Sequence, residues 1–330
     1  MEFPSQLHAA IEEQLSGLPV KKLAVLTEKI SGRYRSGEPS REKVCMDSYQ
    51  DALAYAVFRM PATYAAIYFS IEQAMERLPD LEIKTLLDAG AGPGTAMWAA
   101  SPLWPALDHI TLIERDQNMI ELGRKLCARS GMFSKEQVNW IKADIRDGWE
   151  IKPYDAVIAA YVLNELPQES RAAFVERMWK STAQLLIIIE PGTPAGFLNI
   201  KQVREQLLDQ GANVIAPCPH GKPCPIQDND WCHFSRRVAR SGLHRQVKGA
   251  ELSYEDEKFS FLCLSRTKGM DVDGRVIRHP QIRKGHIYLN LCTPDGLVNT
   301  VVRRRDKEMF RKARELKWGS IINGNFVRNK

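Results

Sequence analysis

The 330-residue sequence lacks an apolar run of about 18 residues, the length that a helix needs to cross a bilayer. Its first residues lack the basic start and apolar block of a secretory signal, and they are not Arg-rich and acid-poor like an organellar presequence. We therefore expect a cytoplasmic protein with no membrane partner. In a reducing compartment, clustered cysteines bind a metal or a cluster more often than they form disulfides.

Cysteine is scarce, but four of the seven cysteines form a pattern. Three lie in the proline-rich stretch 216–234, which cannot be a regular helix or a central strand, and the fourth follows about sixty residues later. The spacing lacks the C-x2-C pairs of zinc ribbons and the C-x2-C-x2-C of ferredoxins, so it predicts a metal or cluster without naming which. His220 or His233 would complete a zinc site, although each is better explained as a surface or supporting residue. The predicted ligands are Cys218, Cys224, Cys232 and Cys292.

The chain also lacks the third glycine of the dinucleotide fingerprint G-x-G-x-x-G, because Thr95 occupies its position. Residues 88–95 read DAGAGPGT between a predicted strand and a predicted helix, with an acidic residue that would repel a pyrophosphate but suits a cationic ligand. This form is typical of S-adenosylmethionine sites, which we favour over a dinucleotide site or a vestigial one. The predicted cofactor-binding residues are Asp88, Gly90, Gly92, Gly94, Glu114 at the ribose hydroxyls and Asp144 at the adenine amino group.

No catalytic residue can be assigned from the sequence. The segment after the predicted fourth strand, 162–166, lacks the Asn-Pro-Pro-aromatic motif of N-methylation, and no cysteine there suits a nucleophile. Asn164 and Glu165 are better interpreted as caps of the following helix. Whether the chain is an enzyme therefore stays open at this stage.

Short apolar runs alternate with helical patterns from residue 81 onward, which predicts a doubly wound α/β fold of the class I S-adenosylmethionine methyltransferase type. We divide the chain into an N-terminal helical region (1–80), with a polar loop at 31–43, a methyltransferase-fold domain (81–270) that contains the cysteine loop, and a C-terminal β-rich, OB-like module with a terminal helix (271–330). The expected strands are 84–90, 109–116, 138–147, 154–166, 184–192, 257–266, 274–280, 284–292 and 297–305.

Charge is distributed unevenly along the chain. Residues 1–200 have a balance of −5, whereas residues 201–330 have 25 Lys and Arg against 14 Asp and Glu, a balance of +11. A solvated charged face is the simpler explanation, but the asymmetry favours RNA as a partner of the C-terminal part. The residues expected to contact RNA are Arg303, Arg304, Arg305, Lys307, Arg311, Lys312, Arg314 and Lys317, with Trp318 to stack on a base, extended by Arg236, Arg237, Arg240 and Arg245.

The chain resembles the methyltransferase-like family of small-ribosomal-subunit assembly factors in five segments. These are the glycine loop at 88–95, IEPGTPAGF at 189–197, the cysteine stretch at 216–234, EDEKFSFL at 255–262 and KWGSII at 317–322. That family is best known from mitochondria, and this chain resembles a bacterial-type member over roughly residues 50–320. The resemblance implies a [4Fe-4S] cluster on the four cysteines and binding to small-subunit rRNA. In parts of the family the role is binding rather than methyl transfer.

Together these features predict a methyltransferase-like protein with an iron–sulfur cluster that uses S-adenosylmethionine and acts on small-subunit rRNA during ribosome assembly. The alternatives are a non-catalytic rRNA-binding assembly factor that keeps the cofactor site, and a zinc-stabilised methyltransferase of a small molecule or protein. If one cluster holds all four cysteines, Cys292 joins the C-terminal module to the rest of the chain. The target nucleotide and the oligomeric state stay open.

Overall fold

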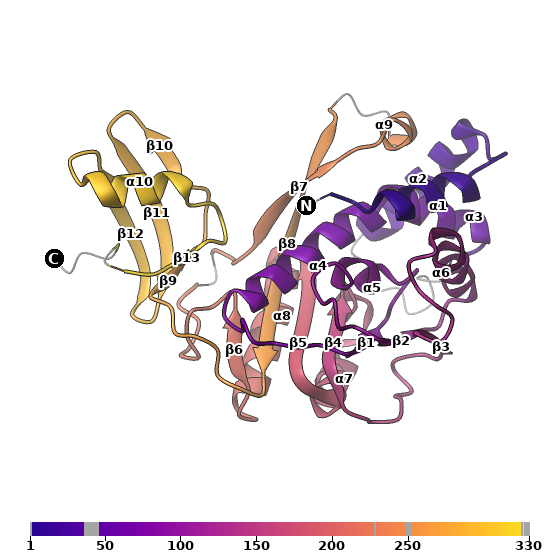
Figure 1. Cartoon of the computed structure of the whole chain (residues 1–330), viewed down its shortest axis with the longest axis horizontal. Helices are drawn as coiled ribbons and strands as arrows, with labels where there is room; N and C mark the ends of the chain where they lie inside the picture. The colour runs from indigo at the N-terminus through magenta and orange to yellow at the C-terminus, as the bar shows by residue number, and fades with distance from the viewer. Residues whose placement is uncertain (1, 36–45, 228, 249–251, 325, 327–330) are drawn as a thin grey trace.

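The computed structural model describes residues 2–35, 46–227, 229–248, 252–324 and 326. Four helices come first among the described residues; the fourth crosses one face of a large sheet, and the first three gather at one end of it (Figure 1). The second helix continues through residues 31–35, which the sequence predicted to be loop, and the rest of that predicted loop lies outside the described residues. The helices are α1 (Ser5–Gln14), α2 (Val20–Arg35), α3 (Tyr49–Phe58) and α4 (Met60–Met75).

The large sheet has the order β3-β2-β1-β4-β5-β8-β6, in which β1 to β5 pair in parallel and β8 runs antiparallel to both β5 and β6. This is the strand order of class I S-adenosylmethionine methyltransferases, so the predicted fold class is confirmed. The strands are β1 (Thr85–Ala89), β2 (His109–Glu114), β3 (Val138–Lys142), β4 (Tyr154–Ala160), β5 (Thr182–Pro191), β6 (Asn213–Ala216), β7 (Phe234–Ala239) and β8 (Tyr254–Ser265).

Helices cover both faces of this sheet, which explains the unbroken apolar run in β5. Leu185 and Ile187 face the core shared with the first four helices, α5 (Thr95–Ala100) and α6 (Gln117–Ser130). Leu186 and Ile188 face the other core, with α7 (Gln168–Ser181) and α8 (Pro194–Leu208). Because successive strand residues point to opposite faces, a strand buried on both sides must be apolar throughout.

Strand β8 is long because one part of it lies inside the large sheet and the other part extends beyond the sheet with β7. Its second half pairs with β5 and β6 inside the sheet, whereas its first half pairs only with β7. The two strands form an arm that leaves the sheet and ends in α9 (Gly242–Lys248), which lies against α2 (Figure 1). The strand predicted at 257–266 is β8, which lies between β5 and β6, and the sequence prediction missed both β6 and β7.

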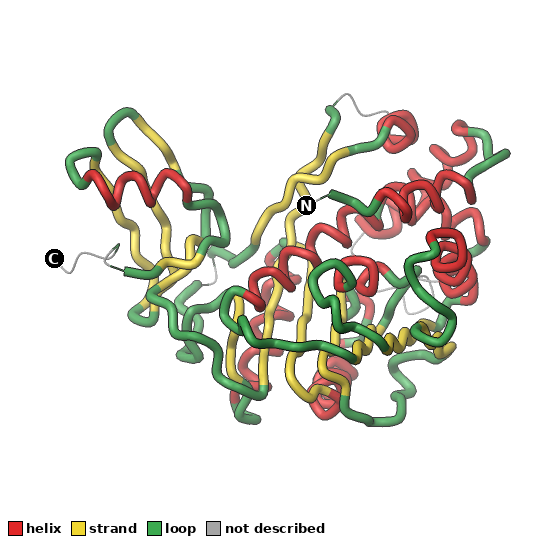
Figure 2. Tube along the Cα trace, viewed as in Figure 1, coloured by secondary structure: helices red, strands yellow, loops and turns green. Residues whose placement is uncertain are grey.

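The C-terminal part forms a separate antiparallel sheet covered on one face by α10 (Lys307–Glu315), as Figure 2 shows in yellow and red. Its core contains Ile287, Leu289 and Leu291 with Ala313 of the helix. Two more strands are present than predicted, and the pairings among the described residues form an open sheet. The strands are β9 (Gly274–Val276), β10 (Gln281–Arg283), β11 (His286–Thr293), β12 (Gly296–Arg303) and β13 (Ile321–Ile322).

Candidate functional site: the glycine loop and the cysteine pocket

The glycine loop joins β1 to α5 at the carboxyl edge of the sheet. Gly90, Gly92 and Gly94 have φ values of 82°, 54° and 83°, in the left-handed region that favours glycine. A Cβ on Gly90 would lie 2.7 Å from a methyl group of Val162, whereas one on Gly92 would meet open space. The loop therefore needs glycine both for its backbone angles and for its contact with the segment after β4.

Glu114, at the end of β2, lies against this loop as predicted from its position. Its carboxylate accepts hydrogen bonds from the backbone N–H groups of Gly92 and Asp116, both at 2.8 Å. Burial raises its pKa, and those two hydrogen bonds partly offset the effect.

Asp144, beyond β3, is differently placed. Its carboxylate forms ion pairs with Arg146 at 2.6 Å and Arg115 at 3.3 Å, and the hydrogen bonds from Arg146 lower its pKa to about 2 despite partial burial. An adenine amino group would therefore compete with two guanidinium groups for this carboxylate. Of the three carboxylates predicted to bind the cofactor, only Asp144 forms ion pairs with arginines among the described residues.

Asp88 is only 2% exposed, so its carboxylate does not face solvent, and it accepts a hydrogen bond from the backbone of Ala96. Burial, followed by repulsion from Glu114, raises its pKa from the ordinary 3.8 to about 8, although a hydrogen bond from the backbone of Ala96 opposes this. The aspartate is thus largely protonated at neutral pH in the absence of a cationic ligand.

The raised pKa predicts a pH effect on stability. The folded chain keeps the Asp88 proton between pH 4 and pH 8, where the unfolded chain has lost it, so stability falls as pH rises through this window. In urea unfolding, the wild type should lose about 4 kcal/mol more than Asp88→Asn between pH 5 and pH 8. Glu190, with a pKa of about 7, titrates in both proteins and cancels. If the unfolding free energies of the two proteins changed with pH in parallel, the raised pKa of Asp88 would be contradicted.

A partly buried polar triad beside the loop was missed by the sequence prediction. The Tyr161 hydroxyl donates to Glu257 at 2.7 Å, Arg59 pairs with the same carboxylate at 2.9 Å, and the Arg59 guanidinium lies 4.4 Å from the centre of the Tyr161 ring. Among the described residues Tyr161 alone has a positive φ without being glycine, at 64°. Tyr161 directly follows β4, Arg59 lies between α3 and α4, and Glu257 belongs to β8, so no local sequence pattern joins them.

The segment after Tyr161 does not cap a helix, so the predicted role of Asn164 and Glu165 is wrong. Both lie in a 3-10 turn, η1 (Leu163–Glu165), and the N-cap position of α7 is Pro167, without a side-chain cap. The Asn164 amide oxygen instead accepts from Asn199 at 2.9 Å, and Asn199 also donates to the fully buried Glu190. These polar groups therefore bind one another.

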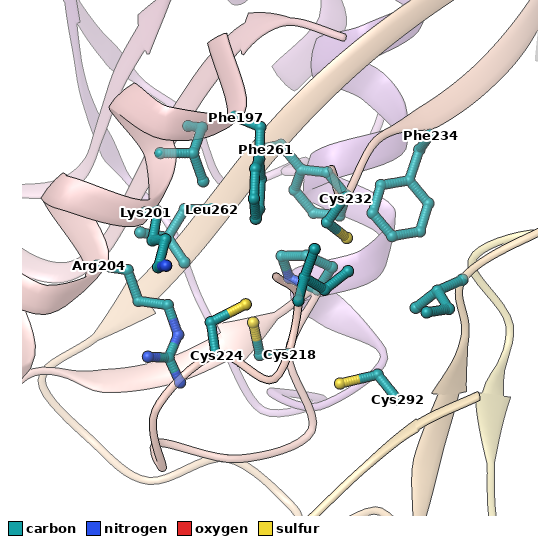
Figure 3. A pocket seen from close by; sticks show the side chains of 14 residues that line it. Phe197, Lys201, Arg204, Cys218, Cys224, Cys232, Phe234, Phe261, Leu262 and Cys292 are labelled. Atoms are coloured by element: carbon teal, nitrogen blue, oxygen red, sulfur yellow. The ribbon is translucent and has the colours of Figure 1, made fainter. Parts of the chain in front are cut away.

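The four predicted ligand cysteines line one pocket, although they come from two distant segments (Figure 3). The pocket encloses about 560 Å³ of empty space, counted out to its open side. Its walls are mainly apolar, and among the described residues that line it Lys201 and Arg204 are charged and none is a carboxylate. Other lining residues are Phe197, Ile226, Phe261 and Ile277.

The thiols affect one another electrostatically. Burial, and then Cys218, raises the pKa of Cys224, and burial with the three other cysteines raises that of Cys232 well above its ordinary value. The pKa of Cys292 rises to about 12 by burial and by Cys218 and Cys224. Within the part of the chain described, no group of three His, Cys, Asp or Glu side chains is close enough to hold a single metal ion. The sulfurs thus share one cavity without converging on one point.

Three buried arginines lie at or near the pocket and lack carboxylate partners at ion-pair distance among the described residues: Arg204 lines it, Arg77 bonds to the Cys218 carbonyl, and Arg275 pairs across the strands with Cys292. Arg204 donates to the carbonyl groups of His220 and Lys222, and Arg77 to those of Ile215 and Cys218. Arg275, from β9 of the C-terminal module, is fully buried and donates to Gln73 of α4 and to the Gly319 carbonyl at 2.8 Å. Its Nε and Nη2 and the Nε of Arg204 have no hydrogen-bond partner in the described structure. Buried cations of this kind are costly unless an anion compensates them.

The IEPGTPAGF motif positions α8, which forms one wall of the pocket. Thr193 caps the helix by accepting from the Gly196 N–H at 3.1 Å, and a Cβ on Gly196 would lie 2.1 Å from the Pro191 carbonyl oxygen. The Gly192 carbonyl accepts from the Trp231 indole at 2.9 Å, which fastens the end of the cysteine loop. The motif therefore allows α8 to pack closely against the end of β5 and the cysteine loop.

Of the two histidines considered for zinc, His220 has its ring next to a predicted ligand, whereas the His233 ring bonds to the Trp231 carbonyl. The His220 Nε2 is 3.8 Å from the Cys292 sulfur, and burial, followed by Arg204, lowers the pKa of His220, so the ring is neutral near pH 7. His233 stacks on Trp231 and packs edge-on against Trp318, outside the residues that line the pocket.

The basic residues divide into distinct sets. On the arm, Arg236 lies 3.9 Å from the centre of the Phe69 ring, Arg237 pairs with Asp256, and Arg240 pairs with Glu255, so these arginines stabilise the arm itself. Trp318, expected to stack on a base, instead packs against His233, His279 and Phe234. In the C-terminal module, however, several basic side chains are exposed and form no ion pair with another described residue: Arg303, Arg304, Arg305, Arg311 and Arg314.

Within the described residues, no helix has the length and apolarity to span a membrane. A solved structure with similar topology is the magnesium protoporphyrin IX methyltransferase of Synechocystis PCC 6803. It has a TM-score of 0.42 and 14% identity, over 72% of this chain and 94% of that one. So weak a likeness adds nothing to the strand order on which the fold assignment rests.

The sequence relatives are more informative. The chain is 28% identical over 290 residues to the mitochondrial ribosome assembly protein METTL17 of Homo sapiens, over 82% of this chain and 62% of that protein. It is 24% identical over 176 residues to the mitochondrial ribosome assembly protein RSM22 of Saccharomyces cerevisiae, over 33% of this chain and 28% of that protein. The chain therefore spans less than two thirds of these relatives.

A family match covers the glycine loop, the cysteine stretch and most of the C-terminal module. Residues 49–323 match the family described as mitochondrial small ribosomal subunit Rsm22. This range includes α3 and the Tyr161 triad as well as all four pocket cysteines. The chain therefore belongs to the Rsm22 family.

Proposed function

We propose that this chain is an assembly factor of the small ribosomal subunit. It binds S-adenosylmethionine at the glycine loop, carries a [4Fe-4S] cluster in the cysteine pocket, and contacts small-subunit rRNA through its C-terminal module. The observation that carries the proposal is the pocket, in which cysteines from residues 216–234 and from β11 meet. The domain boundaries near residues 80 and 270 are part of the proposal. The cytoplasmic location is also part of it, and it differs from that of the relatives, which are named as mitochondrial.

The donor set fits a cluster better than a zinc ion. In a zinc site the sulfurs lie ~3.8 Å apart, because four Zn–S bonds of about 2.3 Å meet at one tetrahedral centre. The thiols here surround a wider space and form no such group among the described residues. A cluster with four cysteinate ligands is an anion, which would compensate Arg77, Arg204 and Arg275. When bound, it supplies an inorganic crosslink between two parts of the chain.

The glycine loop fits S-adenosylmethionine through its backbone and Glu114. The open space at Gly92 lets a ligand approach the main chain, and the Glu114 carboxylate beside it is an acceptor for ribose hydroxyls. Asp88 supports the loop from its buried position, and Asp144 would have to exchange an arginine for adenine. These residues account for cofactor binding, and none of them is a general base for methyl transfer.

Two measurements test the proposal. The first is titration calorimetry of the purified chain with S-adenosylmethionine, in which Glu114→Ala should weaken binding at least tenfold because a charged acceptor is lost. The second is crosslinking of the protein to RNA in cells, followed by sequencing of the attached fragments. Fragments from small-subunit rRNA are the expected result, and their absence would refute the ribosomal role whatever the calorimetry gives.

The non-catalytic alternative is favoured by the segment after β4. In many methyltransferases this edge presents polar groups to the substrate, but here Asn164 is bound to Asn199 and Tyr161 to Glu257. Immature small subunits incubated with labelled S-adenosylmethionine separate the two possibilities. Label in the rRNA supports an enzyme, whereas cofactor binding without label supports a factor that uses the cofactor for structure.

A further inference from the structure

One face of the C-terminal sheet is exposed although the other is packed against α10. Along β11, Ile287, Leu289 and Leu291 are buried under the helix. The alternate residues point the other way, and their cross-strand partners on β12 are all exposed. This face contains Gln281, Arg283, His286, Tyr288, Asn290, Leu297, Asn299, Val301 and Arg303, and we call it the sheet platform.

The centre of the sheet platform is aromatic. The Tyr288 side chain is 43% exposed, and the His286 ring meets it edge-on at 4.9 Å between centroids. Tyr288 pairs across the strands with Gln281 and with Val301, which is also exposed, so the ring lies on a shallow, mostly uncharged surface. Asn290 and Asn299 follow, joined by a 2.6 Å hydrogen bond, and offer further donors and acceptors.

Cations flank the aromatic pair at one end. Arg283 and Arg303 lie opposite His286 on its two neighbouring strands, and neither forms an ion pair with another described residue. Arg311 and Arg314 lie on α10, on the other side of the sheet, and are exposed there. The single basic surface expected from the sequence is therefore two surfaces, and only the sheet platform combines charge with an exposed ring.

We propose that the sheet platform binds single-stranded RNA, with a base stacked on Tyr288 and phosphates held by Arg283 and Arg303. An unpaired base has a π-face that an exposed ring can stack on, whereas a duplex hides its bases and would use charge alone. The platform also ends at the cysteine pocket, because Cys292 lies four residues beyond Tyr288 on the same face of β11, about 13 Å along the strand. This inference rests on the proposed rRNA-binding function and assigns it to one face.

The test is fluorescence anisotropy of the full chain, purified anaerobically, with a labelled uridine oligonucleotide of about 12 nucleotides and a duplex of about the same length. Tyr288→Ala should weaken single-strand binding about tenfold without changing the salt slope, and Tyr288→Phe should bind like the wild type. Arg303→Ala should lower the slope of log K against log salt by about 0.7. Since both side chains are exposed, unchanged melting temperatures should confirm that the variants fold.

The matched control is Arg311→Ala with Arg314→Ala, which removes two exposed charges from the opposite side of the module and should leave single-strand affinity within about twofold. The inference is overturned if Tyr288→Ala binds as well as the wild type, if the control pair loses more affinity than Arg303→Ala, or if only the duplex binds. It is also overturned if Tyr288→Ala impairs binding to ribosomal proteins and not to RNA. None of these outcomes would contradict small-subunit rRNA crosslinked in cells, so the two proposals fail separately.

Discussion

Cys292→Ser is expected to empty the cysteine pocket. Iron in the anaerobically purified protein should fall from about four atoms per chain to below one, and its visible absorption should disappear. The physical reason is that the other three ligands lie in one irregular loop, while Cys292 supplies the fourth from β11. Without the crosslink, the C-terminal module is held to the loop by noncovalent contacts alone, among them the small apolar cluster around Ile226 and Ile277 and the ion pair between Arg278 and Asp230.

Loss of the crosslink should be measurable by limited proteolysis. Cleavage between β8 and β9, at residues 266–273, should become about tenfold faster, since local opening there no longer has to break a ligand bond. Cys127→Ser is the matched control: this thiol on α6 is half-buried next to Met97 and lies outside the pocket. Full iron content and unchanged cleavage in Cys292→Ser would show that Cys292 neither binds the cluster nor joins the two parts.

Gly196→Ala is expected to destabilise the fold by about 3 kcal/mol or more. The new methyl carbon would lie 2.1 Å from the Pro191 carbonyl oxygen, and a backbone atom cannot move aside without shifting β5 or α8. Because α8 also carries Arg204 and other walls of the pocket, iron content should fall together with stability. Urea unfolding monitored by circular dichroism measures the first effect, and iron analysis measures the second.

Gly242→Ala provides the control for this substitution. Gly242 begins α9, has no heavy atom within 4 Å of its added Cβ, and does not have a positive φ. Its stability should equal or slightly exceed that of the wild type, since alanine favours a helix more than glycine does. Equal stability of the two variants would contradict the packing explanation for Gly196.

Local sequence patterns predicted the position of a residue correctly where that position depends on its neighbours in the chain. The three glycines of the cofactor loop adopt the predicted turn because the chain must reverse between β1 and α5 with little space. Glu114 lies beside that loop because parallel strands end at the same edge of the sheet. The roles of these residues in cofactor binding, and of the four cysteines in cluster binding, stay predictions.

Patterns failed where the functional arrangement depends on distant segments. The Tyr161 triad joins residues 59, 161 and 257, and nothing in the sequence near any one of them indicates the other two. Asn164 seemed suited to a helix cap by its type, but the tertiary contact with Asn199 of α8 competes for its amide. Likewise, Trp318 has the composition of an RNA-stacking residue, yet its ring fills the space between His233 and His279.

The sequence by itself determined the sheet, since alternating apolar runs and helices leave few ways to bury both faces of a parallel sheet. It also determined which residue types are available: a glycine turn, four special cysteines and a basic C-terminal part. Only the tertiary structure decided that buried arginines lie near those cysteines and that the basic residues lie on two opposite faces. Charge and residue type are properties of single positions, but burial and facing depend on which segments pack together, and that is settled by the whole fold.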